Sequence, residues 1–195
     1  AIQNFLKLSN LAGQAECLPN GFYRISAEVP SPAPRVSIVI PTRNGKNLVE
    51  QCLRSIYERS TYKNFEVILI DNGSDDPLAL DCFKQWSQTH QVKVIRDERP
   101  FNYSALNNSA VTQAQGEFIC LLNNDIEVLT PSWLEELVSL ALRPGVGAVG
   151  ARLWYPNQTL QHGGVIVGLG GVAGHAHLHL SPDNPGYFGR GVLTQ

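Results

Sequence analysis

The fold is decided by the stretch Val36-Ser37-Ile38-Val39-Ile40-Pro41-Thr42-Arg43-Asn44. Its first five residues form a short apolar run, which is typical of a buried β-strand. Pro41 stops that run, and polar residues follow at once. Residues 46–59 then carry apolar side chains at three- and four-residue spacing, which predicts an amphipathic helix. A buried strand that leads directly into a helix indicates an α/β fold.

The same alternation continues along the chain. It predicts strands at 65–70, 92–95, 117–122 and 146–151, and helices at 77–89, 103–114 and 130–142. Thr130 and Pro131 read as the N-cap and first-turn proline of the last helix. Strands and helices that alternate with short connections predict a Rossmann-like, mainly parallel sheet with helices on both faces. Residues 163–174 contain six glycines, so a loop or hairpin is expected there instead of a further strand–helix unit.

The N-terminal region has a different texture. Residues 1–20 look like a short helix, and Val29–Pro34 has three prolines in alternate places, which is typical of a stiff, extended connector. We therefore expect residues 1–34 to be an N-terminal helix and connector, and 35–195 to be one domain. Because the chain starts at Ala1 and has no Met, we expect it to be a piece of a longer protein, incomplete at its C-terminus.

Composition limits the classes of function. A formal net charge of −2 gives no basic field that would recruit nucleic acid. The chain has no run of 18 apolar residues, so we expect no spanning helix. The cysteines are Cys17, Cys52, Cys82 and Cys120, without a C-x-x-C pair. We interpret them as reduced, mostly buried thiols of a cytoplasmic protein and not as a zinc site.

Polar side chains follow three of the predicted strands. The first strand is followed by Pro41, Thr42, Arg43 and Asn44, the second by Asp71 and Asn72, and the fourth by Asn123, Asn124 and Asp125. The carboxyl ends of these strands should lie together in a right-handed doubly wound sheet. Hydroxyl, amide and carboxylate groups there suit a nucleotide, and a lone carboxylate suits Mg²⁺ or Mn²⁺ that already carries phosphate ligands. The alternative is that residues 123–125 form a simple polar turn.

The motifs resemble those of a known family. The stretches 36–44, 66–75, 105–108 and 116–125 occur in the order seen in the family 2 inverting glycosyltransferases. Residues 146–151, 161–164 and 173–175 look like the rhamnosyltransferase or O-antigen-type subgroup. The resemblance covers about residues 35–190 and implies a GT-A fold. It also implies a UDP- or dTDP-linked sugar donor and a glycan or polysaccharide acceptor.

The resemblance also assigns roles. Thr42 and Asp71 are expected to contact the pyrimidine, and Asn102 matches a position near the diphosphate. Asp125 stands at the second acidic position of the D-x-D motif and is the expected ligand of Mg²⁺ or Mn²⁺. Asn123 stands at the first acidic position, which is a departure, because an amide adds no charge. The remaining nucleotide contacts are expected from Pro41, Arg43, Asn44, Asn72 and Asn124. Arg96 and Arg99 are interpreted as solvated loop charges.

An inverting transferase needs a carboxylate base, which in this family lies well after the D-x-D segment. Asp183 is the only acid after Gln161 and matches that motif poorly. We therefore expect no catalytic residue within this chain, and a base after Gln195. We expect the protein to be cytoplasmic. A further expectation is that the full-length protein associates peripherally with the inner face of the membrane.

Other functions compete with this interpretation. One is a non-catalytic nucleotide-sugar-binding module of a larger enzyme. Another is a nucleotidyltransferase, although residues 42–46 are poor in the glycine and basic residues that it would need. The stretch 168–173 fits the dinucleotide pattern G-x-G-x-x-G/A but no helix pattern follows it. His175, His177 and His179 would share one face of a strand, either as a metal site or as polar positions of a hairpin.

Overall fold

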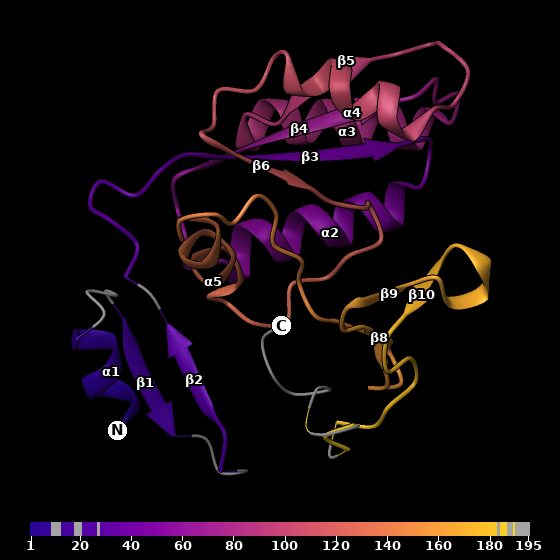
Figure 1. The fold of residues 1–195 in the computed structure, drawn as a ribbon. Helices are drawn as coiled ribbons and strands as arrows, with labels where there is room; N and C mark the ends of the chain where they lie inside the picture. The colour runs from indigo at the N-terminus through magenta and orange to yellow at the C-terminus, as the bar shows by residue number, and fades with distance from the viewer. Residues whose placement is uncertain (9–12, 18–20, 27, 183, 187–188, 190–195) are drawn as a thin grey trace. The chain divides into compact units, whose positions relative to one another are not determined.

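The computed structural model describes residues 1–8, 13–17, 21–26, 28–182, 184–186 and 189 (Figure 1). The chain divides into two compact units. One is Val29–Val138, and the other combines Ala1–Glu28 with Ser139–Gln195. The domain boundary predicted between residues 34 and 35 stays a prediction.

The unit Val29–Val138 follows the predicted alternation. Its elements in chain order are β3 (Val36–Thr42), α2 (Lys46–Arg59), β4 (Phe65–Asp71), α3 (Pro77–His90), β5 (Lys93–Arg96), α4 (Tyr103–Val111), β6 (Phe118–Leu121) and the start of α5 (Trp133–Ala141). The four strands form one sheet in the order β5-β4-β3-β6, and every pairing is parallel. The predicted α/β fold is confirmed.

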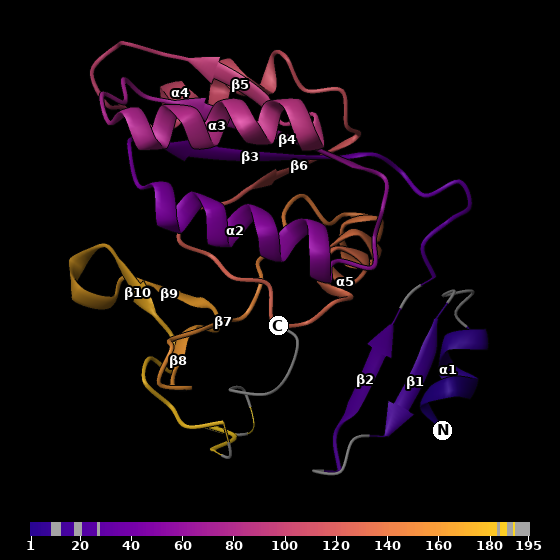
Figure 2. The same cartoon turned by 180° about the vertical axis from the view of Figure 1, so that it is seen from behind.

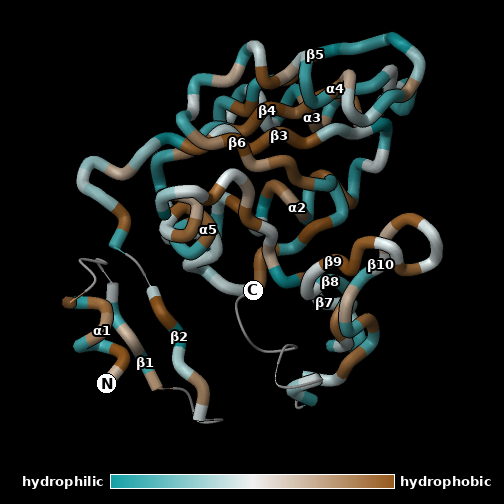
Figure 3. The backbone as a smooth tube through the Cα atoms, in the orientation of Figure 1, coloured by the Kyte–Doolittle hydropathy of each residue, from teal (hydrophilic) through white to brown (hydrophobic). Residues whose placement is uncertain are grey.

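Helices cover both faces of this sheet, as predicted. Buried residues of α2, α3 and α5 pack with Val36, Ile38 and Ile40 of β3 in the main core cluster. The opposite face packs against α4, through Leu106 and Ala110. Figures 1 and 2 show α2 and α4 on opposite sides of β3. In Figure 3 the central strands are coloured as hydrophobic, in keeping with burial on both faces.

The strand order contains a reversal that matters for function. From β3 the chain moves outward to β4 and β5, then crosses through α4 and returns to the other side of β3 as β6. The order therefore reverses between β3 and β6. In open α/β sheets such a switch point opens a crevice at the carboxyl ends of the strands, where ligands bind.

The amino ends of the strands are tied by a polar network around the buried Ser37. The Ser37 hydroxyl donates to Glu66 Oε1 at 2.6 Å and accepts from the Gly116 N–H at 2.8 Å. Glu66 Oε1 also accepts from the Gln115 N–H at 2.6 Å. Because Gly116 passes so close to β3, a Cβ on it would lie 2.5 Å from the backbone nitrogen of Ser37.

The other unit holds short elements. They are α1 (Ile2–Leu8), β1 (Gln14–Cys17), β2 (Tyr23–Ser26), β7 (Leu153–Trp154), β8 (Leu160–His162), β9 (Val165–Val167), a 3₁₀ turn (Leu169–Gly171) and β10 (Ala173–His175). The pairs β1–β2, β7–β8 and β9–β10 are antiparallel. The hairpin expected within 163–174 is confirmed.

Two sequence predictions fail in this unit. The N-terminal helix ends at Leu8, and an antiparallel pair follows it in place of further helix. The strand predicted at 146–151 is absent, although all six residues are described. Gly147 and Gly150 interrupt that segment, and glycine in a strand offers no side chain to pack.

The helices that the structure describes include none that is both long and apolar enough to cross a membrane. Cys52 and Cys82 are buried free thiols and Cys120 is a partly buried one, whereas Cys17 is exposed. Burial raises the pKa of the Cys52 thiol to about 12.

The short distance between Gly116 and the backbone of β3 leads to a prediction about stability. Gly116→Ala should lower the free energy of unfolding by about 1–3 kcal/mol, because the new methyl group overlaps backbone atoms of β3. Gly147→Ala is the matched control, since nothing lies within 4 Å of its Cβ position. It should change stability by less than about 0.5 kcal/mol. Urea denaturation of both variants measures this, and equal stabilities would contradict the packing described.

Candidate functional site

A cavity of about 330 Å³ opens at the carboxyl ends of β3, β4 and β6. Its walls include the predicted residues Pro41, Thr42, Arg43, Asn72, Asn123, Asn124 and Asp125. The first helical turns of α4 and the residue before its cap add Phe101, Tyr103 and Leu106. The cavity therefore lies at the reversal of strand order, and it joins residues that are up to 84 positions apart in sequence (125 − 41).

One hydrogen bond ties the two sides of the switch point together. Asn124 Nδ2 donates to Thr42 Oγ1 at 2.9 Å, joining the segment after β6 to the last residue of β3. Just before it, the Leu122 N–H donates to the Val39 carbonyl at 2.9 Å. Asp125 directly follows Asn124, which this hydrogen bond holds in place, and Asp125 therefore lines the cavity.

Asp71 is buried at the end of β4, with 2% of its surface exposed. Its Oδ1 accepts from the Ser74 N–H at 2.8 Å, and its Oδ2 accepts from Arg96 Nη1 at 2.6 Å. Asp71 does not line the cavity, so its expected contact with a pyrimidine stays a prediction. Its observed role is to hold the turn after β4 and the Arg96 side chain.

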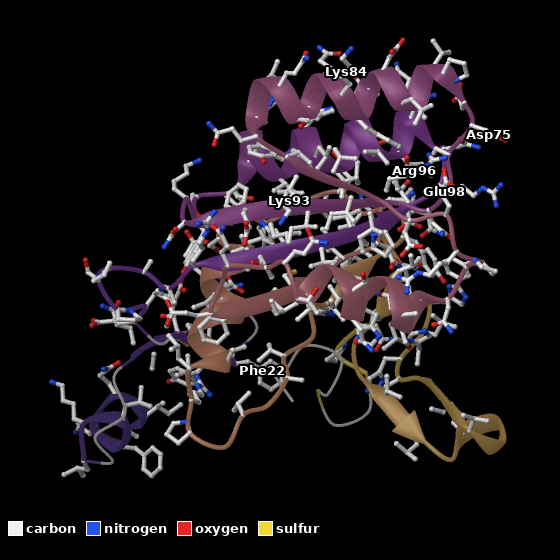
Figure 4. All side chains as sticks on the ribbon, turned by 90° about the horizontal axis from the view of Figure 1, so that it is seen from above. Phe22, Asp75, Lys84, Lys93, Arg96 and Glu98 are labelled. Atoms are coloured by element: carbon white, nitrogen blue, oxygen red, sulfur yellow. The ribbon has the colours of Figure 1, made fainter. Side chains whose placement is uncertain are left out.

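The interpretation of Arg96 as a solvated loop charge holds only in part, because 42% of its side chain is exposed but the residue belongs to a strand. Arg96 ends β5, and the parallel register places it directly beside Asp71. Its Nη1 also donates to the Ser74 carbonyl at 2.8 Å. Figure 4 shows Arg96 with Glu98 at one end of the sheet, on the side where Asp75 lies. The signal in the sequence was that both residues end adjacent strands.

The loop from Asp97 to Asn102 is anchored to the end of β4. The buried Asn72 amide donates through Nδ2 to the carbonyls of Asp97, at 3.0 Å, and Arg99, at 2.9 Å. The Asp97 N–H donates to the Asp71 carbonyl at 2.9 Å. Within the loop, the Arg99 guanidinium hydrogen-bonds the Asp97 carboxylate and lowers the pKa of Asp97 to about 2. Arg99 is a solvated loop charge as interpreted, with 60% of its side chain exposed, and it is also paired with Asp97.

Two predicted nucleotide-binding amides organise loops outside the cavity lining. Asn44 accepts from the N–H groups of Asp75 and Asp76, and its Nδ2 donates to the Asp75 carboxylate at 2.8 Å. Asn102 caps α4, with its Oδ1 accepting from the Ala105 N–H at 2.9 Å. Their expected contacts with a nucleotide stay predictions.

Asp125 is the acidic side chain in the cavity wall. Across the residues that the structure describes, no cluster of three or more His, Cys, Asp and Glu side chains could hold a metal ion. A cation at Asp125 would therefore need most of its ligands from a bound phosphate and water. That coordination is typical of Mg²⁺ and of Mn²⁺, which has similar ligand preferences.

The histidines after Gln161 do not share a strand face. Only His175 belongs to β10, while His177 and His179 have left-handed backbones with φ of 59° and 64°. His175 Nδ1 instead lies 2.9 Å from His162 Nδ1. The idea of three histidines on one strand is therefore wrong. Asp183, the other candidate acid, lies outside the described residues.

A second cavity, of about 400 Å³, runs along the outer side of α2. Its charged side chains pair among themselves, as Glu50 does with Arg54 and Glu127 with Arg59. It contains no strand end from the sheet. The cavity at β3 and β6 is therefore the stronger candidate for a ligand site.

Comparison with known proteins agrees with this geometry. The family model described as glycosyl transferase family 2 matches residues 37–165, which include β4, β5, β6, all of β3 except its first residue, and the cavity lining. The chain belongs to glycosyltransferase family 2. The family 2 match ends at Val165, the first residue of β9.

Two curated relatives cover most of this family 2 chain. The protein y4gI of Sinorhizobium fredii is 53% identical over 163 residues, which are 83% of this chain and 18% of y4gI. The O-antigen biosynthesis protein RfbC of Myxococcus xanthus is 44% identical over 173 residues, 82% of this chain and 13% of RfbC. The chain thus spans less than a fifth of the length of either relative.

A solved structure shares the fold. The mannosyltransferase PcManGT of Pyrobaculum calidifontis, in complex with GDP-Man and Mn²⁺, matches with a TM-score of 0.59 and 27% identity. The match covers 68% of this chain and 39% of PcManGT. The GT-A fold expected from the resemblance is confirmed.

The anchored loop yields a prediction on Asn72. Asn72→Ala should lower the free energy of unfolding by about 1–3 kcal/mol, because two carbonyls near the end of β4 lose their donor. It should also speed amide hydrogen exchange within residues 97–102. Asn64→Ala is the control, since that exposed amide makes one hydrogen bond, to the Ala33 carbonyl. Similar exchange rates in the two variants would show that Asn72 does not hold the loop.

Proposed function

We propose that this chain is the donor-binding part of an inverting glycosyltransferase. The donor is a UDP- or dTDP-linked sugar, bound with Mg²⁺ or Mn²⁺ at the ends of β3, β4 and β6. The acceptor is a glycan or polysaccharide. Similarity to RfbC, which is described as an O-antigen biosynthesis protein, supports that class of acceptor.

The observation that carries the proposal is the Asn124–Thr42 hydrogen bond beside Asp125. It fixes a hard oxygen ligand at the switch point of the sheet, within a cavity whose other polar lining groups are amides, hydroxyls and an arginine. A dianionic diphosphate would be poorly held by the single guanidinium of Arg43. A divalent cation between Asp125 and the phosphates would balance the charge.

The donor set fits such a metal. Asp125 supplies one carboxylate, and Mg²⁺ in phosphate sites commonly takes one or two carboxylates with phosphate and water oxygens. When bound, the cation stabilises the negative charge on the departing nucleoside diphosphate. The binding of Mn²⁺ by PcManGT, which shares the fold, is consistent with this assignment. Asn123 and Asn124 line the same cavity and add no negative charge that would repel the phosphates.

Donor binding and chemistry are separate steps in the proposed enzyme. Inversion needs a carboxylate to deprotonate the acceptor hydroxyl. Asp125 is committed to the metal and Asp71 to Arg96, so neither is assigned that proton. The base is assigned to a residue after Gln195, in the longer protein.

A non-catalytic sugar-nucleotide-binding module is the second candidate. The amide of Asn123 at the first acidic position favours it, because it removes one charge from the expected metal ligands. The two functions differ in one measurement on the longer protein. Transfer of sugar from a UDP- or dTDP-sugar supports the enzyme, whereas donor binding without turnover supports the module.

The metal assignment predicts the behaviour of Asp125→Asn. In the unmodified chain, Mn²⁺ should tighten UDP binding by about tenfold or more, which is about 1.4 kcal/mol. In Asp125→Asn the Mn²⁺ effect should vanish, because the remaining cavity ligands carry no negative charge. Isothermal titration calorimetry with and without Mn²⁺ measures both affinities.

Asp81→Asn is the matched control, because Asp81 is exposed on α3 and does not line the cavity. It should keep the full Mn²⁺ effect. If Asp125→Asn also kept that effect, the metal assignment would be wrong. If the unmodified chain bound no UDP, dTDP or GDP at all, the proposed function itself would fail.

A further inference from the structure

Phe101 is an exposed aromatic side chain at the mouth of the cavity. Its exposed fraction is 72%, whereas Leu106 beside it in the cavity wall is 1% exposed. Single exposed apolar side chains are common on protein surfaces, so exposure alone decides nothing. Phe101 differs from Phe5, another exposed ring, because it lines a cavity on a tightly anchored loop.

The loop fixes where the ring stands. Asn72 donates two hydrogen bonds to it, and the Asp97 N–H donates a third to β4. On its other side, Asn102 caps α4 immediately after Phe101. A ring held between two fixed points offers its face to a ligand at little cost in conformational entropy, which is the advantage of preorganisation.

The order of the strands decides which part of a nucleotide meets this ring. Asp125 follows β6 and Asn72 follows β4, with β3 between them. Two strand spacings separate those ends by roughly 10 Å. A nucleoside diphosphate whose phosphates lie at Asp125 must extend its base toward Asn72 and the loop that carries Phe101.

We propose that Phe101 is the platform on which the base of the bound nucleotide stacks. This inference rests on the proposed function and extends it by assigning the face of the base to a residue of this chain. Every base has a π-face, so such a platform adds affinity for any base. Choice among bases then falls to hydrogen-bonding groups at the ends of β3 and β4.

The chemistry of the wall favours a base over a sugar ring. A planar aromatic ring stacks most effectively on another planar ring, with the two faces offset. Tyr103, Pro41 and Leu106 add further apolar surface to the cavity lining that contains Phe101. Polar groups line the cavity at the ends of β3 and β4 and after β6, where Asp125 lies. The cavity therefore combines apolar surface for a base with polar groups for the phosphates.

The test compares ligands with and without a base. Affinities of the 195-residue chain for UDP and for inorganic pyrophosphate are measured with Mn²⁺, using pyrophosphate as a competitor of UDP. Phe101→Ala should weaken UDP binding about five- to hundredfold and leave pyrophosphate binding unchanged. Phe101→Tyr, which keeps the ring, should restore UDP binding. Leu78→Ala is the control, since Leu78 is 65% exposed on α3 and does not line the cavity.

Several results would overturn the proposal. Unchanged UDP affinity in Phe101→Ala would show that the base does not stack on this ring. If the same variant of the longer protein then had a lower affinity for the acceptor, the ring would be assigned to acceptor binding instead. An equal loss of affinity for UDP and for pyrophosphate would mean that the ring supports the part of the cavity that binds the phosphates, and not the base. Thermal unfolding of each variant separates these results from loss of fold. Failure of the unmodified chain to bind any nucleotide would instead reject the proposed function.

Discussion

The carboxyl end of β3 is the constraint on which the rest of the site depends. β3 is buried along its length and pairs in parallel with β4 on one side and β6 on the other. Its last residue, Thr42, accepts the Asn124 amide from across the switch point. Because a slip of one residue in either pairing would move each core side chain of β3 to the opposite face of the sheet, into the other core cluster, the strand ends meet in one register. The cavity follows from that register.

Amide side chains hold most of the site together, and few are left free for a ligand. Asn44 fixes the turn after β4, Asn72 anchors the loop that follows β5, and Asn124 joins β6 to β3. Asn102 caps α4. Among the side chains that line the cavity without such a structural task are Asp125 and the ring of Phe101. They are also the residues to which we assign the two ends of the nucleotide.

The sequence predicted the features that depend on local pattern. The apolar runs that end at Thr42, Asp71 and Asn123 can be read from the sequence without knowing the fold. The meeting of their ends at one edge follows once those runs are taken as strands of a doubly wound sheet. The pairing of Arg96 with Asp71 was missed, because it depends on the register between β4 and β5, which is non-local. Phe101 was passed over because only the path of its anchored loop brings it to the cavity. The predicted strand at 146–151 failed because its glycines weaken a pattern that looked apolar.

The proposed function requires that the ends of β3, β4 and β6 form one metal–nucleotide site. Crystals grown with UDP and Mn²⁺, measured at a wavelength where manganese scatters anomalously, test this requirement most directly. We expect a single manganese peak within bonding distance of the Asp125 carboxylate and of the diphosphate, with the base beside Phe101. A manganese peak elsewhere, or UDP bound away from these strand ends, would contradict it.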